Sequence, residues 1–89
     1  MKKVTIDIRN IHTVKALHIY LAYLLELPAH YGMNLDALYD ALSTESRDTV
    51  ITLVGAGAAQ GELAAYMPRL LQVFEDAAEE NDRLHMKIG

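Results

Sequence analysis

Three short segments with strand character lie at the beginning, middle and end of this 89-residue chain, and the residues between them have helical character. Apolar and polar side chains alternate in residues 4–8 and in residues 84–88, which is typical of strands with one buried face. Residues 49–54 form a continuous run rich in β-branched side chains, which is typical of a central strand covered on both faces. Because helices separate the strands, the connections are crossovers and the sheet is predicted to be parallel.

Two helical patterns lie between the first and second strands. The first begins after Thr13, a good N-cap residue, and ends near Pro28. Its apolar positions are Val14, Leu17, Leu21 and Leu24. The second begins after Asn34, another N-cap residue, and ends within residues 43–47, with Leu35, Leu38 and Leu42 as its buried stripe.

A third and longer helix is predicted between the second and third strands. Pro68 is placed in its first turn, where proline is tolerated, and the helix runs to about Asn81. The segment of residues 55–65 has too poor a periodicity for an assignment, although it could carry a further helical turn. These patterns predict an α/β fold in a single domain over residues 1–89: a small three-stranded parallel sheet covered by three to four helices.

Composition and charge narrow the classes of function. The net charge of −4 disfavours direct binding of nucleic acid and favours a basic partner. There is no cysteine, and His12, His18 and His85 lack metal-ligand spacing, so neither a metal site nor another cofactor is expected. The first residues do not resemble a signal peptide, and the apolar stretch of residues 16–27 is too short to span a bilayer. We therefore expect a cytoplasmic protein.

The second predicted helix carries an unusual pair of carboxylates. At about 100° per residue, Asp36, Asp40 and Ser43 fall on one narrow face opposite the leucines, with Tyr39 at its margin. An exposed like-charge pair at this spacing costs an isolated helix about 0.2–0.5 kcal/mol. Asp36 is favoured by the helix dipole in the first turn, whereas nothing in the stability of the fold explains Asp40.

The surrounding residues resemble the barstar family of ribonuclease inhibitors. Residues 27–42 carry the pattern Leu-Pro-x-x-Tyr-Gly-x-Asn-Leu-Asp-Ala-Leu-aromatic-Asp. Lys2-Lys3, Leu17-His18 and Leu71-Gln72-Val73-Phe74 fall at corresponding places. The resemblance implies a barstar-like inhibitor domain over residues 1–89 and a non-enzymatic function: the loop and second helix plug the active-site groove of a secreted, guanine-preferring bacterial ribonuclease.

The resemblance also implies a set of contact residues and the role of one of them. Asp40 matches the aspartate that takes the place of an RNA phosphate among the basic residues of the enzyme. The other implied contacts are His30, Tyr31, Gly32, Asn34, Leu35, Asp36, Tyr39, Ser43 and Asp76. The chain departs from the family by having His30 in place of an aromatic residue, and Tyr39 and Glu45 in place of tryptophans.

Three other interpretations remain open from the sequence. The protein could be an immunity or interaction protein against a toxin nuclease unrelated to barnase. An enzyme could use Asp36 and Asp40 as an acid–base pair beside His30 or Tyr39, but no phosphate loop, nucleophile motif or metal motif accompanies them.

Finally, the outward residues of the first helix carry no charge, which is compatible with a homodimer through this face. These residues are Ile19, Tyr20, Ala22 and Tyr23.

Overall fold

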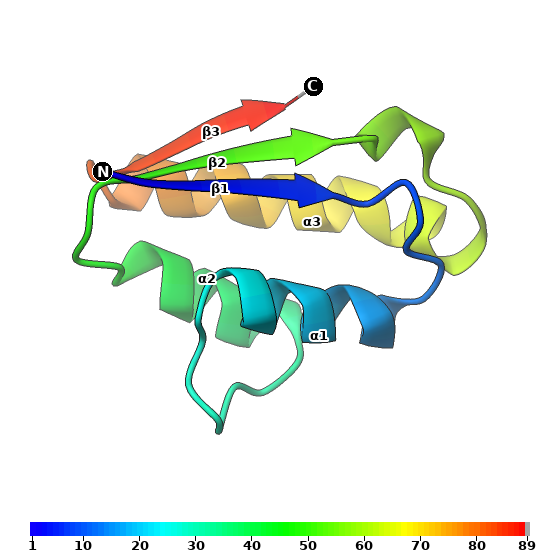
Figure 1. Cartoon of the computed structure of the whole chain (residues 1–89), viewed down its shortest axis with the longest axis horizontal. Coiled ribbons are helices and arrows are strands. Elements are labelled where there is room, and N and C mark those ends of the chain that lie inside the picture. Colours follow the sequence, from blue (N-terminus) through cyan, green and yellow to red (C-terminus); the bar gives the residue numbers. More distant parts are fainter. Residues whose placement is uncertain (89) are drawn as a thin grey trace.

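The computed structural model describes residues 1–88 and contains the predicted order of strands and helices. The strands are β1 (Lys2–Asp7), β2 (Thr49–Val54) and β3 (Leu84–Ile88), and the helices are α1 (Val14–Leu24), α2 (Leu35–Ser43) and α3 (Gly61–Glu80). A short 3₁₀ helix, η1 (Ala56–Ala58), lies between β2 and α3. The three strands form one parallel sheet with β2 in the centre (Figure 1). The predicted α/β fold is therefore confirmed.

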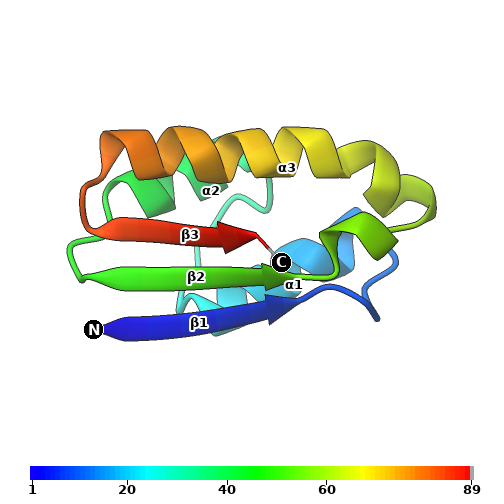
Figure 2. The ribbon, with the colours of Figure 1, turned by 90° about the horizontal axis from the view of Figure 1, so that it is seen from above.

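Within residues 1–88 the sheet is covered on one face only, so the prediction that β2 is covered on both faces is wrong. Figures 1 and 2 show α1, α2 and α3 on the same side of the strands. Burial along β2 alternates accordingly: Ile51 and Leu53 are fully buried, whereas Val50 and Thr52 are half-buried. β-branched residues suit an open face of a sheet as well as a covered one, so their unbroken run did not reveal the difference.

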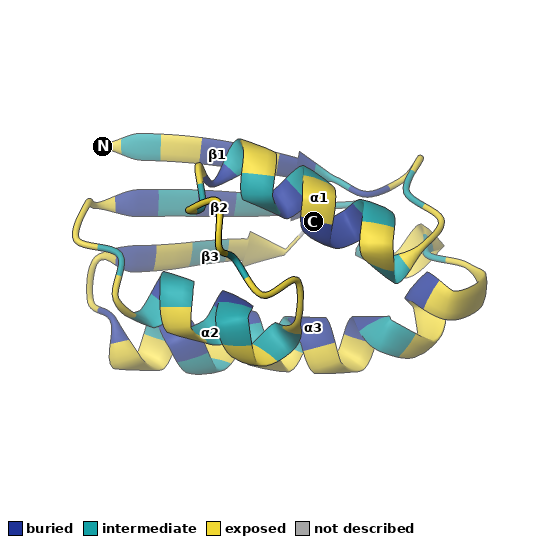
Figure 3. Ribbon diagram, turned by 90° about the horizontal axis from the view of Figure 1, so that it is seen from below, coloured by how far each residue is buried: buried dark blue, intermediate teal, exposed yellow. Residues whose placement is uncertain are grey.

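The hydrophobic core lies between the covered face of the sheet and the three helices. Figure 3, which looks from the helix side, shows the buried positions on the inner faces of these elements. The fully buried members include Ile6, Leu17, Leu21, Leu38, Ile51, Leu53, Leu63, Leu70 and Phe74. Both predicted N-caps are confirmed, because the Thr13 hydroxyl accepts a hydrogen bond from the Ala16 amide and the Asn34 carbonyl oxygen from the Ala37 amide.

The third helix begins at Gly61, seven residues before Pro68, so its predicted start is wrong. Proline lacks an amide hydrogen and leaves the carbonyl of residue 64 without its helical partner. Ala64 and Pro68 are both exposed, so water can reach that carbonyl group. Leu63 and Met67 extend the buried stripe before the proline, and their burial stabilises the additional turns.

Candidate functional site

The loop of residues 25–34 joins α1 to α2 and is fixed by its own hydrogen bonds. The Tyr31 amide donates to the Pro28 carbonyl at 2.9 Å. The Asn34 side chain donates from Nδ2 to the Gly32 carbonyl at 3.0 Å, while its Oδ1 caps α2. The same asparagine therefore holds the end of the loop and the beginning of the helix.

A buried histidine supports this loop from beneath. His18 on α1 has no exposed surface, and its Nδ1 and Nε2 lie 2.7 and 2.8 Å from the hydroxyl oxygens of Tyr31 and Tyr66. A neutral imidazole has one donor and one acceptor nitrogen, so one hydroxyl accepts from the ring and the other donates to it. Burial lowers the pKa of His18 and raises the pKa values of both tyrosines, which favours the uncharged forms. The trio ties the loop to α1 and α3.

The α2 face predicted from the sequence is exposed at both carboxylates. Asp36 and Asp40 are exposed, and Tyr39 and Ser43 are half-buried. The hydroxyls of Ser43 and Thr44 donate to the backbone carbonyl of Asp40, at 3.3 and 2.7 Å, and not to its carboxylate. Within residues 1–88, no hydrogen bond or ion pair reaches the Asp40 side chain, so its carboxylate is available to a partner.

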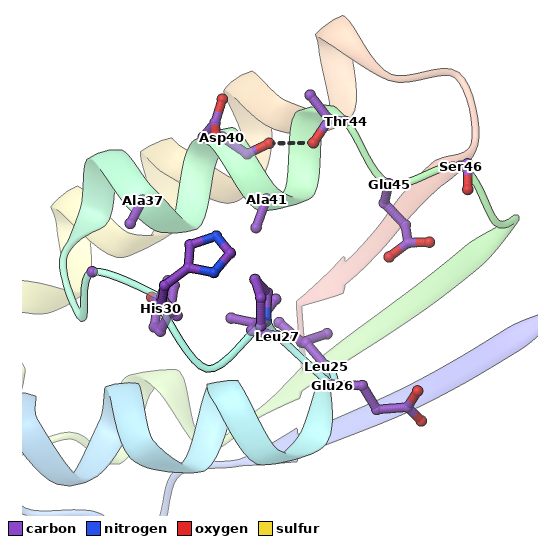
Figure 4. A pocket seen from close by; sticks show the side chains of 13 residues that line it. Leu25, Glu26, Leu27, His30, Ala37, Asp40, Ala41, Thr44, Glu45 and Ser46 are labelled. Atoms are coloured by element: carbon purple, nitrogen blue, oxygen red, sulfur yellow. Dashed lines mark hydrogen bonds between the residues drawn. The ribbon is translucent and has the colours of Figure 1, made fainter.

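A pocket of about 390 Å³ lies between this loop and α2. Its apolar wall is formed by Leu25, Leu27, Pro28, Tyr31, Ala37 and Ala41. Its polar lining includes Glu26, His30, Asp40 and Glu45 (Figure 4). In Figure 4 the His30 ring points into the pocket beneath α2, and Glu45 lies toward the opposite end. Asp40 is therefore an acidic group on the edge of a cavity.

Two comparisons with known proteins show which family the chain belongs to. A family model described as "Barstar (barnase inhibitor)" matches residues 1–88. The chain belongs to the barstar family. It is also 38% identical over 82 residues to a Bacillus subtilis (strain 168) protein named "Putative ribonuclease inhibitor YrdF", an alignment that covers 90% of this chain and 89% of that protein.

The contact residues implied by the barstar resemblance are only partly gathered in one place. His30, Tyr31, Gly32 and Asp40 line the pocket. Asn34, Leu35, Asp36, Tyr39 and Ser43 belong to the adjoining loop end and α2 but do not line it. Asp76 lies on α3, where it is half-buried and accepts a hydrogen bond from Gln72 Nε2 at 2.9 Å. A role of these residues in binding stays a prediction.

The sequence interpretation missed a group of charges at the other end of the pocket. The Arg47 side chain donates to Glu45 at 2.8 and 3.3 Å, and its Nη1 lies 3.6 Å from the carboxylate of Glu26. Hydrogen bonds from Arg47 are the main reason that the pKa of Glu45 is lowered. The separation of Glu45 and Arg47 by two residues was a sequence signal for one contact, whereas the bridge to Glu26 depends on the fold.

Two negative observations apply to the described part of the chain. Residues 1–88 contain no cluster of three or more histidine and acidic side chains arranged to hold a metal ion. Among the helices of those residues, none is long and apolar enough to cross a membrane.

Proposed function

We propose that this protein inhibits a secreted, guanine-preferring bacterial ribonuclease by plugging its active-site groove with the 25–34 loop and α2. Family membership and the printed name of the Bacillus relative support a ribonuclease-inhibitor role. The observation that carries the finer proposal is Asp40, an exposed carboxylate at a pocket with no partner inside residues 1–88. A ribonuclease groove holds cations for the RNA phosphates, and a carboxylate can bind them in place of a phosphate.

The remaining implied residues surround Asp40 in this proposal. His30, Tyr31, Gly32 and Asn34 present the loop, and the α2 residues extend the contact along the helix. These α2 residues are Leu35, Asp36, Tyr39 and Ser43. Asp76 on α3 lies at the basic rim of the enzyme. The function needs no cofactor and no turnover by the inhibitor, and it protects the cytoplasm of the producing cell.

A second candidate is an immunity or interaction protein against a toxin nuclease unrelated to barnase. It is favoured by the pocket itself, because His30 and Glu45 replace family aromatics and both line the pocket. Aromatic anchors contribute much of the binding energy of interfaces, so these changes alter which surface fits. Both candidates use the same loop and helix and differ in the partner.

The test is to mix the purified protein with each secreted ribonuclease and each toxin nuclease encoded in its own genome. Complex formation and RNA cleavage are measured together. Stoichiometric loss of cleavage by a barnase-type ribonuclease supports the first candidate, and inhibition confined to an unrelated toxin supports the second. RNA hydrolysis by the protein alone would contradict both.

A further inference from the structure

The two edges of the sheet are not equally protected against pairing with another strand. β1 and β3 are the outer strands. Just after β1, the Ile8 amide donates to the Val54 carbonyl at 3.0 Å, so by alternation the peptide groups of residues 3, 5 and 7 face away from β2. Lys3 places a charge on this edge, and the Asp7 amide donates to the Tyr20 hydroxyl at 3.4 Å. Charges and a covered amide are features that keep an edge strand unpaired.

The β3 edge lacks such protection. The Arg83 carbonyl accepts from the Thr49 amide at 2.8 Å, so by alternation the peptide groups of Met86 and Ile88 face away from β2. Both side chains are apolar, and Met86 is half-buried while Ile88 is 51% exposed. Within residues 1–88, no side chain forms a hydrogen bond with the backbone of either residue. The edge therefore presents unpaired amide and carbonyl groups between apolar side chains.

An open groove of about 510 Å³ accompanies this edge. Figure 2 shows α3 running along the outer side of β3, and the groove lies between these two elements. It is lined by Gln72, Glu75, Ala78 and Glu79 from α3 and by Met86 from β3. None of these residues is among the contacts proposed for the nuclease. The groove is therefore a second surface, separate from the 25–34 loop and α2.

The two faces of β3 carry opposite charges. On the groove side, Glu75 and Glu79 are exposed, and no ion pair within residues 1–88 reaches either carboxylate. On the open face of the sheet, His85 and Lys87 are exposed. Side chains of a strand alternate between the two faces of a sheet, so a strand added to β3 would direct every second side chain toward the glutamates. Basic side chains match that face, and uncharged ones suit the other.

We propose that the β3 edge receives an extended segment of a partner protein as a fourth strand, with basic side chains directed toward Glu75 and Glu79 and an apolar side chain on Met86. In such strand addition, backbone hydrogen bonds supply affinity, and contacts of alternate side chains supply specificity. A second copy of this chain fits less well. Two β3 strands paired about a twofold axis would bring the glutamates of both α3 helices to one seam, where like charges repel.

The probe is the peptide acetyl-Lys-Thr-Val-Thr-Lys-amide, which has the length of β3 and places both lysines and the valine on one face. It is titrated into full-length ¹⁵N-labelled protein at constant ionic strength. We expect saturable shifts at the amides of Ala78, Met86 and Ile88, with a dissociation constant on the order of millimolar for so short a peptide. Hydrogen exchange at the Met86 amide should become about threefold slower, because that amide gains an acceptor.

A second peptide and two charge variants test the alternation. The peptide acetyl-Lys-Lys-Val-Thr-Thr-amide has the same composition but directs one lysine to each face, so it should bind at least about threefold more weakly. Replacing both groove carboxylates, Glu75→Gln with Glu79→Gln, should weaken binding of the first peptide about fivefold. The matched control Glu80→Gln removes a charge of α3 outside the groove and should change binding by less than about twofold.

A proline variant tests the backbone of the edge. Met86→Pro removes an amide that the ladder with β2 does not use, a position at which an edge strand tolerates proline. It should abolish binding, whereas Met86→Leu keeps the amide and should bind within about twofold of the original protein. If Met86→Pro does not fold, Ile88→Pro takes its place and should show the same loss.

Four results would overturn the proposal: equal affinity for the two peptides, unchanged binding by the double glutamine variant, unchanged binding by the proline variant, or shifts confined to the 25–34 loop and α2. A fifth concerns the occupant. If the Met86 and Ile88 amides shift with protein concentration in the absence of peptide, the edge pairs with a second copy of the chain, and the proposal of a basic partner segment is wrong.

Discussion

Asp40 is the residue at which binding and folding can be separated most cleanly. Its side chain faces away from the leucine stripe of α2, so Asp40→Ala opens no cavity and removes repulsion with Asp36. The free energy of unfolding should change by less than about 0.5 kcal/mol. In a complex the same change leaves cations of the enzyme buried and unpaired, which costs about 2–5 kcal/mol, a range to which barnase–barstar complexes themselves contribute.

At about 1.4 kcal/mol per decade, that cost predicts at least roughly thirtyfold weaker inhibition, mainly through faster dissociation. The measurement is a titration of the nuclease that the original protein inhibits, carried out with Asp40→Ala and with Asp36→Ala. Thermal unfolding first shows that both variants fold. An Asp40→Ala protein that inhibits at the concentration of the unmodified protein would mean that α2 is not the centre of the plug.

His18 makes stability depend on pH through a single buried group. Burial lowers its pKa in the folded protein, while the unfolded chain binds a proton near pH 6.5. As the pH falls below about 6.5, His18 binds a proton in the unfolded state but not in the folded state, so stability decreases. The decrease continues until the pH reaches the pKa of His18 in the folded protein. Above about pH 6.5 the ring is neutral in both states and contributes no slope.

The check is the free energy of unfolding of the original protein and of His18→Gln, measured in urea between about pH 7.5 and about pH 5. The difference between the two slopes isolates His18, because the three other histidines are exposed and present in both proteins. Parallel slopes would show that His18 is protonated as readily in the folded chain as in the unfolded one.

Among the elements, α3 offers a direct test of where a helix begins. Because α3 starts at Gly61, Pro68 interrupts its interior, where proline is less favourable than alanine by about 3 kcal/mol. Part of that difference is offset by the smaller entropy of the unfolded chain that contains proline. Pro68→Ala should therefore raise the free energy of unfolding by about 2 kcal/mol.

Urea unfolding of Pro68→Ala gives this value, with Glu79→Ala on the same helix as a control that should change it by no more than about 0.5 kcal/mol. If the helix began at the proline, the residue would be favourable at that position and its replacement would not stabilise the protein.

The elements also show which parts of the structure the sequence could predict. Period-two spacing identified β1 and β3, a continuous run rich in β-branched residues identified β2, and helical spacing identified α1, α2 and α3, whereas η1 was not assigned. The local caps Thr13 and Asn34 fixed two helix starts, because those signals reside in neighbouring residues. The open face of the sheet and the bridge from Arg47 to Glu26 were missed because both depend on which segments meet in space. The start of α3 was predicted wrongly for a third reason, because the burial of Leu63 and Met67 before Pro68 outweighs the local helix-breaking effect of the proline.

At the scale of the whole molecule, the outer face of α1 is the surface on which self-association would depend. Ile19 and Tyr23 are 53% and 80% exposed, as predicted, but Tyr20 and Ala22 are half-buried. The Tyr20 hydroxyl accepts a hydrogen bond from the Asp7 amide at 3.4 Å, which directs that ring toward β1. Two exposed apolar side chains are a small patch beside the roughly 1,200 Å² that a stable interface buries.

We therefore expect light scattering to give the monomer mass at about 100 μM, a concentration at which an interface of that size would be populated. A dimer mass at this concentration would identify α1 as an interface, and Tyr23→Glu should then restore the monomer.

The net charge of the molecule affects how quickly a partner arrives rather than how long it stays. The chain carries a charge of −4, and Glu75, Glu79 and Glu80 are exposed along one end of α3. Such a field attracts a basic enzyme over distances near the Debye length, about 8–10 Å at moderate ionic strength, and does not need contact.

Removing one of these charges should slow association by less than about threefold and leave dissociation nearly unchanged. Stopped-flow measurements with the nuclease that this protein inhibits should therefore show the association rate of Glu79→Ala approaching that of the original protein as the salt concentration is raised. The faster dissociation of Asp40→Ala should persist at high salt. If Glu79→Ala instead dissociates faster than the original protein, and high salt does not remove the difference, the acidic end of α3 lies inside the interface rather than at its rim.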